Sequence, residues 1–249
     1  MASFNKYTVI KNAVSYELAN FCYNYFLLKR DAIGFMYDNN LIAQNSFYGT
    51  WTDQQVPGCY SIYGDHVMET LLMKVLPVMK EKTGLNLVPT YSYARVYEKG
   101  SELKRHKDRP SCEISTTLCI GYDNSNVDAS KYPDWDWPMF VGPKTGEIGT
   151  EGMPIHMKPG DMLIYRGDVV EHWREPLWGN NHAQVFLHYN EKEGQYDIPY
   201  DGRPLLGMPS TFRSKEALNK NEDIAVSKQD NDSESKGLFM PEYKDKVVY

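Results

Sequence analysis

Short segments of strand-forming residues fill the middle of the chain and constrain its fold more than any other feature. Between residues 86 and 190, runs such as "LVPTYSYARVY", "CEISTTLCI", "DMLIYR" and "AQVFLHYN" are rich in β-branched and aromatic residues, and Gly, Pro, Asn or Asp bounds each run. Strands this short, separated by such turns, are typical of an all-β barrel or sandwich. The sequence therefore predicts a mainly β fold for this region.

Two helices are predicted before the strands. Ser15 can cap a helix that extends to about residue 37, and Asp65 can open a second one that Gly84 ends. The stretch 44–64 is rich in Gly, Pro, Tyr and Gln and predicts a loop. The apolar residues expected on one face of the first helix are Leu18, Phe21, Cys22, Tyr25 and Leu28.

Three parts of the chain are expected from these patterns. Residues 1–85 form a helical N-terminal part that packs on the barrel, and residues 86–195 form the barrel core. Residues 196–249 lose the apolar periodicity and form a polar C-terminal extension or lid.

Charge and composition exclude several classes of protein. The 249 residues carry a formal net charge of −6, which argues against a generally basic nucleic-acid-binding surface. No apolar run approaches the roughly 20 residues of a membrane span, and no secretory signal is evident. The four cysteines form no CxxC pair, which favours free thiols in a reducing compartment. We therefore expect a cytoplasmic protein that is not bound to a membrane.

The chemistry is concentrated around "ELKRHKDRPSCEIS", where His106 and Asp108 are one residue apart. Residues i and i+2 of a strand point to the same side, so an imidazole and a carboxylate would share one space. His172, at the end of "YRGDVVEHW", can supply a third ligand if the sheet closes. Two His and one carboxylate on one face of a metal leave positions open, as in non-haem Fe(II) sites. Zinc is the chemical rival, and a solvated surface pair is the simpler reading of an isolated His-x-Asp.

The surroundings of this motif resemble a known family. "YEKGSELKRHKD" has the form Tyr-x-x-Gly-x-x-Leu-x-x-His-x-Asp, and "MKPGDMLIYRGDVVEHWREPLWG" follows it in order. Together they resemble the Fe(II)/2-oxoglutarate-dependent oxygenases, particularly the prolyl 4-hydroxylase-like branch. The resemblance implies a double-stranded β-helix, a jelly-roll or cupin-like barrel, with flanking helices. It also implies Fe(II), 2-oxoglutarate and O₂, with His106, Asp108 and His172 as catalytic metal ligands.

The position that binds the far carboxylate of 2-oxoglutarate departs from the family pattern. The family places Lys or Arg about ten residues beyond the second metal-binding His, but here position 182 is histidine. His182 can serve if it is protonated, or as a neutral donor with a neighbour's help. Arg174, two residues after His172, would also point inward, where a buried Arg requires an anion. That anion is either the cosubstrate or a protein carboxylate such as Glu175.

Further cosubstrate-binding residues are expected on the neighbouring strands. By the resemblance, Tyr97 matches the family's cosubstrate-binding Tyr. Arg95 lies two residues before Tyr97, so on a strand its side chain would point to the same side, into the barrel. Gln184, two residues after His182, can complete the pocket. Arg109 is a weaker candidate, for which an ion pair with Glu113 is the favoured interpretation.

The function implied is hydroxylation of an unidentified prolyl, peptidyl or small-molecule substrate, with release of succinate and CO₂. One alternative is a catalytically inactive barrel that binds a ligand, which would account for the histidine at position 182. The other is a zinc-dependent hydrolase, although no HExxH motif is present.

The rim of the barrel is expected to be formed by residues 44–64, the insert 122–138 and the tail from 195. In the insert, Trp135 and Trp137 alternate with Asp134 and Asp136, so an aromatic and acidic rim is predicted.

Overall fold

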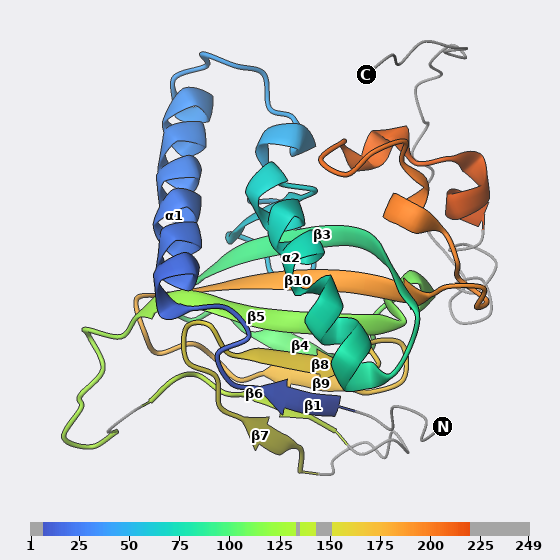
Figure 1. The fold of residues 1–249 in the computed structure, drawn as a ribbon. Helices are drawn as coiled ribbons and strands as arrows, with labels where there is room; N and C mark the ends of the chain where they lie inside the picture. The colour runs from blue at the N-terminus through green and yellow to red at the C-terminus, as the bar shows by residue number, and fades with distance from the viewer. Residues whose placement is uncertain (1–6, 133–134, 143–150, 220–249) are drawn as a thin grey trace.

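The computed structural model describes residues 7–132, 135–142 and 151–219, and they form a mainly β structure of two antiparallel sheets (Figure 1). The larger sheet has six strands in the order β1 (Tyr7–Ile10), β8 (Met162–Tyr165), β5 (Ile114–Asp123), β10 (Asn181–Glu191), β3 (Leu87–Glu98) and β2 (Tyr60–Tyr63). The smaller sheet has the order β4 (Leu103–His106), β9 (His172–Arg174), β6 (Met139–Val141) and β7 (Met153–Ile155). The mainly β fold expected from the sequence is confirmed.

Two long helices, α1 (Tyr16–Asp38) and α2 (His66–Thr83), lie on the same side of the larger sheet (Figure 1). The described residues also form four short 3₁₀ helices: η1 (Ser46–Tyr48), η2 (Pro110–Cys112), η3 (Pro199–Gly202) and η4 (Ser210–Phe212). No helix in the described part of the chain is both long enough and apolar enough to cross a membrane.

The starts of both long helices follow from their capping residues. The side chain of Ser15 accepts a hydrogen bond from the backbone N–H of Leu18, and that of Asp65 accepts from Val67 and Met68. These bonds satisfy backbone donors that the first turn of a helix leaves free. Gly84 ends α2 in the left-handed conformation, with φ 70°, as its position predicted.

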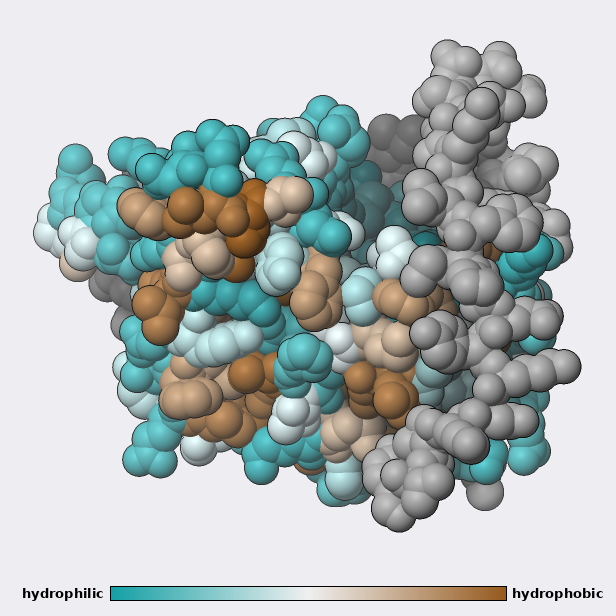
Figure 2. All heavy atoms as spheres, turned by 90° about the horizontal axis from the view of Figure 1, so that it is seen from above, coloured by the Kyte–Doolittle hydropathy of each residue, from teal (hydrophilic) through white to brown (hydrophobic). Residues whose placement is uncertain are grey.

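The buried face of α1 agrees with the expected one at Cys22, and Leu18 and Tyr25 are partly buried against the core, but it differs at Phe21 and Leu28. Phe21 and Leu28 are 63% and 70% exposed, whereas the residues that pack on the sheet are Ala19, Cys22, Phe26 and Ile33. Both sets have helical spacing, so periodicity alone does not choose between them. Seen from above, the molecule carries apolar side chains in several separate groups among hydrophilic ones (Figure 2).

The larger sheet separates an apolar core from a polar interior. Alternate residues of its central strands, such as Val96 on β3 and Val185 on β10, join the core formed with α1 and α2. The intervening residues point to the other face, toward the smaller sheet. Among them are Arg95 and Gln184, which lie opposite each other in the β3–β10 pairing. The space between the two sheets therefore receives charged and aromatic side chains.

The stretch 44–64 is not wholly a loop, contrary to expectation. Its last residues form β2, which pairs with β3, and Thr50 forms an isolated bridge with Ser61. These pairings hold the segment 51–59 close to β3. The N-terminal residues also supply β1, which pairs with β8. The polar stretch 220–249, predicted to be an extension, lies outside the described residues.

Candidate active site

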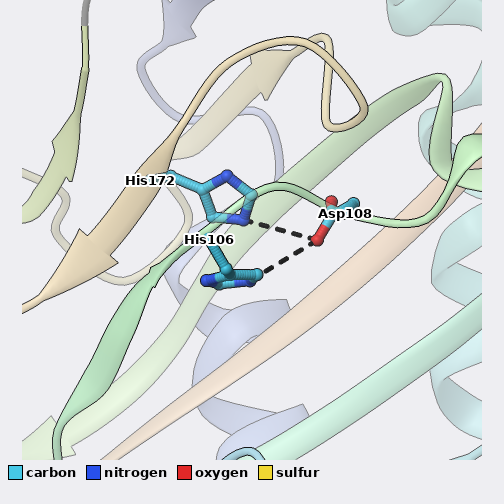
Figure 3. A group of neighbouring side chains, drawn as sticks. All are labelled: His106, Asp108 and His172. Atoms are coloured by element: carbon cyan, nitrogen blue, oxygen red, sulfur yellow. Dashed lines mark ion pairs between the residues drawn. The ribbon is translucent and has the colours of Figure 1, made fainter. Parts of the chain in front are cut away.

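His106, Asp108 and His172 converge between the two sheets (Figure 3). His106 and His172 lie opposite each other in the β4–β9 pairing, with their ring centroids 4.2 Å apart. Oδ1 of Asp108 lies 3.6 Å from Nε2 of His106 and 3.4 Å from Nε2 of His172. All three ligand atoms are within 4.8 Å of one another, so they can hold one cation.

Both imidazoles present the correct nitrogen for a metal. Nδ1 of His106 lies 2.7 Å from the carbonyl oxygen of Lys104, and Nδ1 of His172 lies 3.0 Å from that of Val170. Because a carbonyl oxygen only accepts, each Nδ1 carries a hydrogen, and in the neutral ring Nε2 keeps its lone pair for a metal. Metal-binding histidines are commonly oriented by such bonds from the other ring nitrogen.

The three side chains also attract positive charge. Burial would raise the pKa of Asp108, but the imidazoles of His172 and His106 hold this pKa well below its ordinary value. Burial would likewise lower the pKa of His172, but the Asp108 carboxylate outweighs burial and raises it. The chain therefore favours a cation at the point where the three groups meet.

The orientation of Asp108 depends on two residues that the sequence did not single out. Its backbone N–H donates to the carbonyl oxygen of Gly167 at 2.8 Å, and its Oδ2 accepts from Oγ of Ser115 at 3.1 Å. A Cβ added at Gly167 would lie 2.3 Å from that Oδ2 and 2.6 Å from the Ser115 oxygen. Only glycine fits behind the carboxylate without displacing it.

We expect Gly167→Ala to weaken metal binding by about 10- to 100-fold, as the loss of outer-shell support for a ligand typically does. The added methyl group would push Asp108 away from the two imidazoles. Titration of the metal-free protein with Co²⁺ or Ni²⁺ measures the effect. Gly34→Ala is the matched control, because a Cβ there meets only the Trp51 ring, at 3.5 Å. Equal affinities of Gly167→Ala and wild type would contradict the role of Gly167.

A cavity of about 260 Å³ opens beside the three side chains. Aromatic residues, including Tyr93, Tyr165 and Phe186, form part of its wall, and Lys107 and Arg109 contribute positive charge. The wall thus combines apolar surface with cations, next to the candidate metal ligands.

The segment 51–59 reaches this cavity and engages both His106 and Arg95. The amide nitrogen of Gln55 lies 2.9 Å from Nε2 of His106 and donates to its lone pair, and the amide oxygen accepts from both Arg95 Nη atoms at 3.1 Å. Nη2 of Arg95 pairs with Asp53 at 2.7 Å, and the Tyr93 hydroxyl donates to the same carboxylate. Arg95 is therefore bound by a protein carboxylate, which disfavours the cosubstrate-binding role expected for it.

We expect Asp53→Asn to lower stability near neutral pH by an amount that shrinks in acid. Burial would raise the pKa of Asp53, but the Tyr93 hydroxyl and Arg95 lower it below the ordinary 3.8. A carboxyl whose pKa is lower in the folded state than in the unfolded state stabilises the folded chain at pH values above its unfolded-state pKa. This contribution to the free energy of unfolding is lost as the pH falls through the folded-state pKa. Urea unfolding at a series of pH values measures the gap between variant and wild type. A gap as large in acid, below both pKa values, as at neutral pH would contradict this account.

Arg174 is buried without a carboxylate partner among the residues that the structure describes. Its Nη1 donates to the Trp137 carbonyl, and its guanidinium stacks on the Trp137 ring, 4.6 Å from the centroid. Nη2 lies 3.2 Å from the Gln184 amide oxygen, and Nε has no hydrogen-bond partner in the described part of the chain. Glu175, the alternative partner considered from the sequence, instead accepts from the Trp173 indole N–H. A buried cation paired this incompletely can accommodate an anionic ligand.

His182 is neutral and so does not supply the cation. Burial and the nearby Arg174 cation hold the pKa of His182 well below 6.5, which rules out the protonated role considered for it. Its Nε2 bonds to the Gln184 amide, while Nδ1 has no partner among the described residues.

Tyr97 lies opposite His182 in the β3–β10 pairing, is fully buried, and packs edge to face on Trp137. Tyr97, His182 and Gln184 thus form one buried polar group with Arg174.

Two other interpretations from the sequence are wrong. Arg109 pairs with Asp201 of η3 at 2.9 Å rather than with Glu113, because the chain beyond β10 returns to the cavity. Trp137 and Asp136 are buried rather than exposed on a rim, since Trp137 lies against Arg174 and Asp136 pairs with His156 at 2.7 Å. Asp134 lies outside the described residues.

Comparisons with known proteins bear on the fold. No protein-family model matches the sequence, and no curated protein sequence matches it. Among solved structures, a prolyl-4-hydroxylase from Pseudomonas putida matches 75% of this chain and 92% of its own, with 13% identity and a TM-score of 0.52. The non-haem α-ketoglutarate-dependent epimerase SnoN from nogalamycin biosynthesis matches 76% of this chain and 77% of its own, with 8% identity and a TM-score of 0.50.

These matches show a common fold. The chain has the fold of a prolyl-4-hydroxylase and of SnoN. The fold that the motifs in residues 97–108 and 157–179 implied is therefore confirmed.

Proposed function

We propose that this protein is an Fe(II)- and 2-oxoglutarate-dependent dioxygenase. His106, Asp108 and His172 would bind the iron, and the two sheets would form the double-stranded β-helix of such enzymes, with residues 86–195 as the catalytic core. Residues 1–85 would pack on this core, and residues 196–249 would form an extension or lid. One observation carries the proposal: the Nε2 atoms of two imidazoles and a carboxylate oxygen meet beside a buried arginine that forms no ion pair with a described carboxylate.

The ligand set fits the metal. Two imidazoles and one carboxylate leave coordination positions for a chelating cosubstrate and dioxygen, the arrangement of non-haem Fe(II) oxygenases. A zinc hydrolase with the same ligands would have no use for the buried cation of Arg174, whereas a dicarboxylic cosubstrate would neutralise it. This difference favours oxygenase over hydrolase.

Arg174 is the proposed partner of the far carboxylate of 2-oxoglutarate. It lies two residues from His172 on β9, about 6.6 Å along the strand, which is close to the length of a five-carbon dicarboxylate. Gln184 and Tyr97 would add hydrogen-bonding groups from the same polar cluster, and His182 would take part as a neutral ring. Arg109 lines the cavity more directly, but Asp201 already neutralises it.

When bound, iron and 2-oxoglutarate would activate O₂ with release of succinate and CO₂ and oxidise a C–H bond of the substrate. The contribution of the chain is to hold three ligands in fixed orientation and to line the cavity with aromatic rings that limit water. We propose hydroxylation of a prolyl, peptidyl or small-molecule substrate. The two structural neighbours support this range, because one is a prolyl hydroxylase and the other a biosynthetic epimerase.

The test uses the purified chain without oxygen. Added Fe(II) and 2-oxoglutarate should together produce the weak visible charge-transfer band of the chelate, and admission of O₂ should produce succinate. Metal binding without the band would contradict the proposal. Screening peptides and metabolites for the gain of one oxygen mass then addresses the substrate.

A further inference from the structure

A second group of metal-ligating side chains lies next to the first and shares one residue with it. Asp108, Cys112 and His188 each place a ligand atom within 4.8 Å of the other two. Asp108 can serve both groups because its oxygens differ in surroundings. Oδ1 faces the two imidazoles described above, whereas Oδ2 lies toward Ser115, whose Oγ is 2.8 Å from Nδ1 of His188.

The sulfur of Cys112 lies beside two groups that favour a thiolate, but burial and the Asp108 charge outweigh them and raise the pKa of the thiol to about 12, so the sulfur is protonated until a metal displaces its proton. The side chain is buried, and its Sγ lies 3.0 Å from the Tyr91 hydroxyl. That hydroxyl accepts the Nε–H of Arg109 at 3.2 Å, and in its contact with the sulfur either the hydroxyl or the thiol can be the donor. Arg109 and Tyr91 act against burial on the pKa of Cys112, so they would support the thiolate once a metal is bound, as outer-shell partners of metal ligands do.

His188 is buried and lines the same cavity, with its ring 4.4 Å from that of Tyr91. Ser115 bonds its Nδ1, and Nε2 makes no hydrogen bond within residues 7–132, 135–142 and 151–219. Because the ring lines the cavity, this nitrogen can be reached by a ligand and is free to bind a cation. This unpartnered nitrogen is an observation independent of the cysteine.

We propose that Asp108, Cys112 and His188 form a second cation site, selective for a thiophilic divalent metal such as Zn²⁺. Thiolate, imidazole and carboxylate are ligands that zinc accepts in four-coordinate sites, whereas the first group offers only nitrogen and oxygen. Binding forms a metal–sulfur bond and releases the thiol proton to solvent. Because both sites draw on Asp108, a metal bound here competes with one bound to His106 and His172. The site does not depend on the proposed oxygenase function.

Co²⁺ alone is the probe that separates the two sites. His106→Ala/His172→Ala removes the first site and retains Asp108, Cys112 and His188. We expect this double variant to bind one Co²⁺ per chain and to show the near-ultraviolet thiolate-to-cobalt charge-transfer band. Adding Cys112→Ser should abolish the band and weaken Co²⁺ binding at least tenfold. Adding Cys22→Ser instead, at a buried cysteine of α1, should change neither.

Absence of the band in the double variant, or a band that survives Cys112→Ser, would overturn the proposal. Circular dichroism checks that each variant is folded. If the double variant does not fold, excess Co²⁺ added to the wild-type chain should show the same band. If Cys112→Ser does not fold, His188→Gln should keep the band and lower Co²⁺ affinity at least tenfold, and unchanged affinity contradicts the proposal. A missing 2-oxoglutarate chelate band in the wild type would instead contradict only the proposed oxygenase function.

Discussion

His172→Ala is expected to abolish the Fe(II)–2-oxoglutarate chelate and to lower metal affinity by more than about 100-fold. Loss of an outer-shell partner alone typically costs 10- to 100-fold, and His172 is itself a proposed ligand. The substitution removes the Nε2 that lies 3.4 Å from Asp108 and leaves that partly buried carboxylate with one imidazole. Titration with Fe(II) and 2-oxoglutarate without oxygen, followed by the visible band, measures the loss.

His66→Ala is the matched control for this substitution. His66 is exposed at the start of α2 and does not line the cavity, so its replacement should leave the band unchanged. If His172→Ala kept a full chelate band while remaining folded, the proposed ligand set would be wrong. Equal loss in His66→Ala would point to a general effect on folding rather than on the site.

Arg174→Met is expected to weaken 2-oxoglutarate binding by about 2 kcal/mol or more, roughly 30-fold, with little net change in the stability of the ligand-free chain, because the desolvation cost that it removes offsets the lost hydrogen bonds to Trp137 and Gln184. Truncating one partner of a buried charge pair costs this much in binding. Without the cosubstrate, Arg174 has no described carboxylate partner, and burial lowers its pKa. Replacing such a cation by an apolar side chain of similar length removes a desolvation cost. Calorimetry with 2-oxoglutarate and the metal, together with thermal unfolding, measures both effects.

Arg109→Met provides the comparison, because Arg109 is the cation that lines the cavity. Its removal leaves the buried Asp201 carboxylate without its 2.9 Å partner, so stability should fall by roughly 2 kcal/mol. We expect 2-oxoglutarate affinity to change less than in Arg174→Met. The reverse order of affinities would transfer the carboxylate-binding role to Arg109.

The sequence by itself determined the features that depend on local patterns. Ser15 and Asp65 mark the helix starts, because a helix needs a side-chain acceptor for its first N–H groups. The strand-forming runs indicated a mainly β barrel or sandwich, and the motif containing His106, Asp108 and His172 indicated a metal site. The structure places His106 and His172 on the paired strands β4 and β9 and Asp108 in the loop after β4, not on a strand. Each of these inferences needs only residues a few positions apart, or a motif with fixed spacing.

Only the tertiary structure decided which distant segments meet at the site. It brings Gln55 and Asp53 to His106 and Arg95, pairs Arg109 with Asp201, and buries Trp137 against Arg174. These contacts join residues that are tens of positions apart, and each depends on how a connection returns to the sheets. Local periodicity does not predict the path of these connections. Several charged or aromatic residues could each fill the same place beside a sheet, and charge balance and packing in the folded chain select one of them.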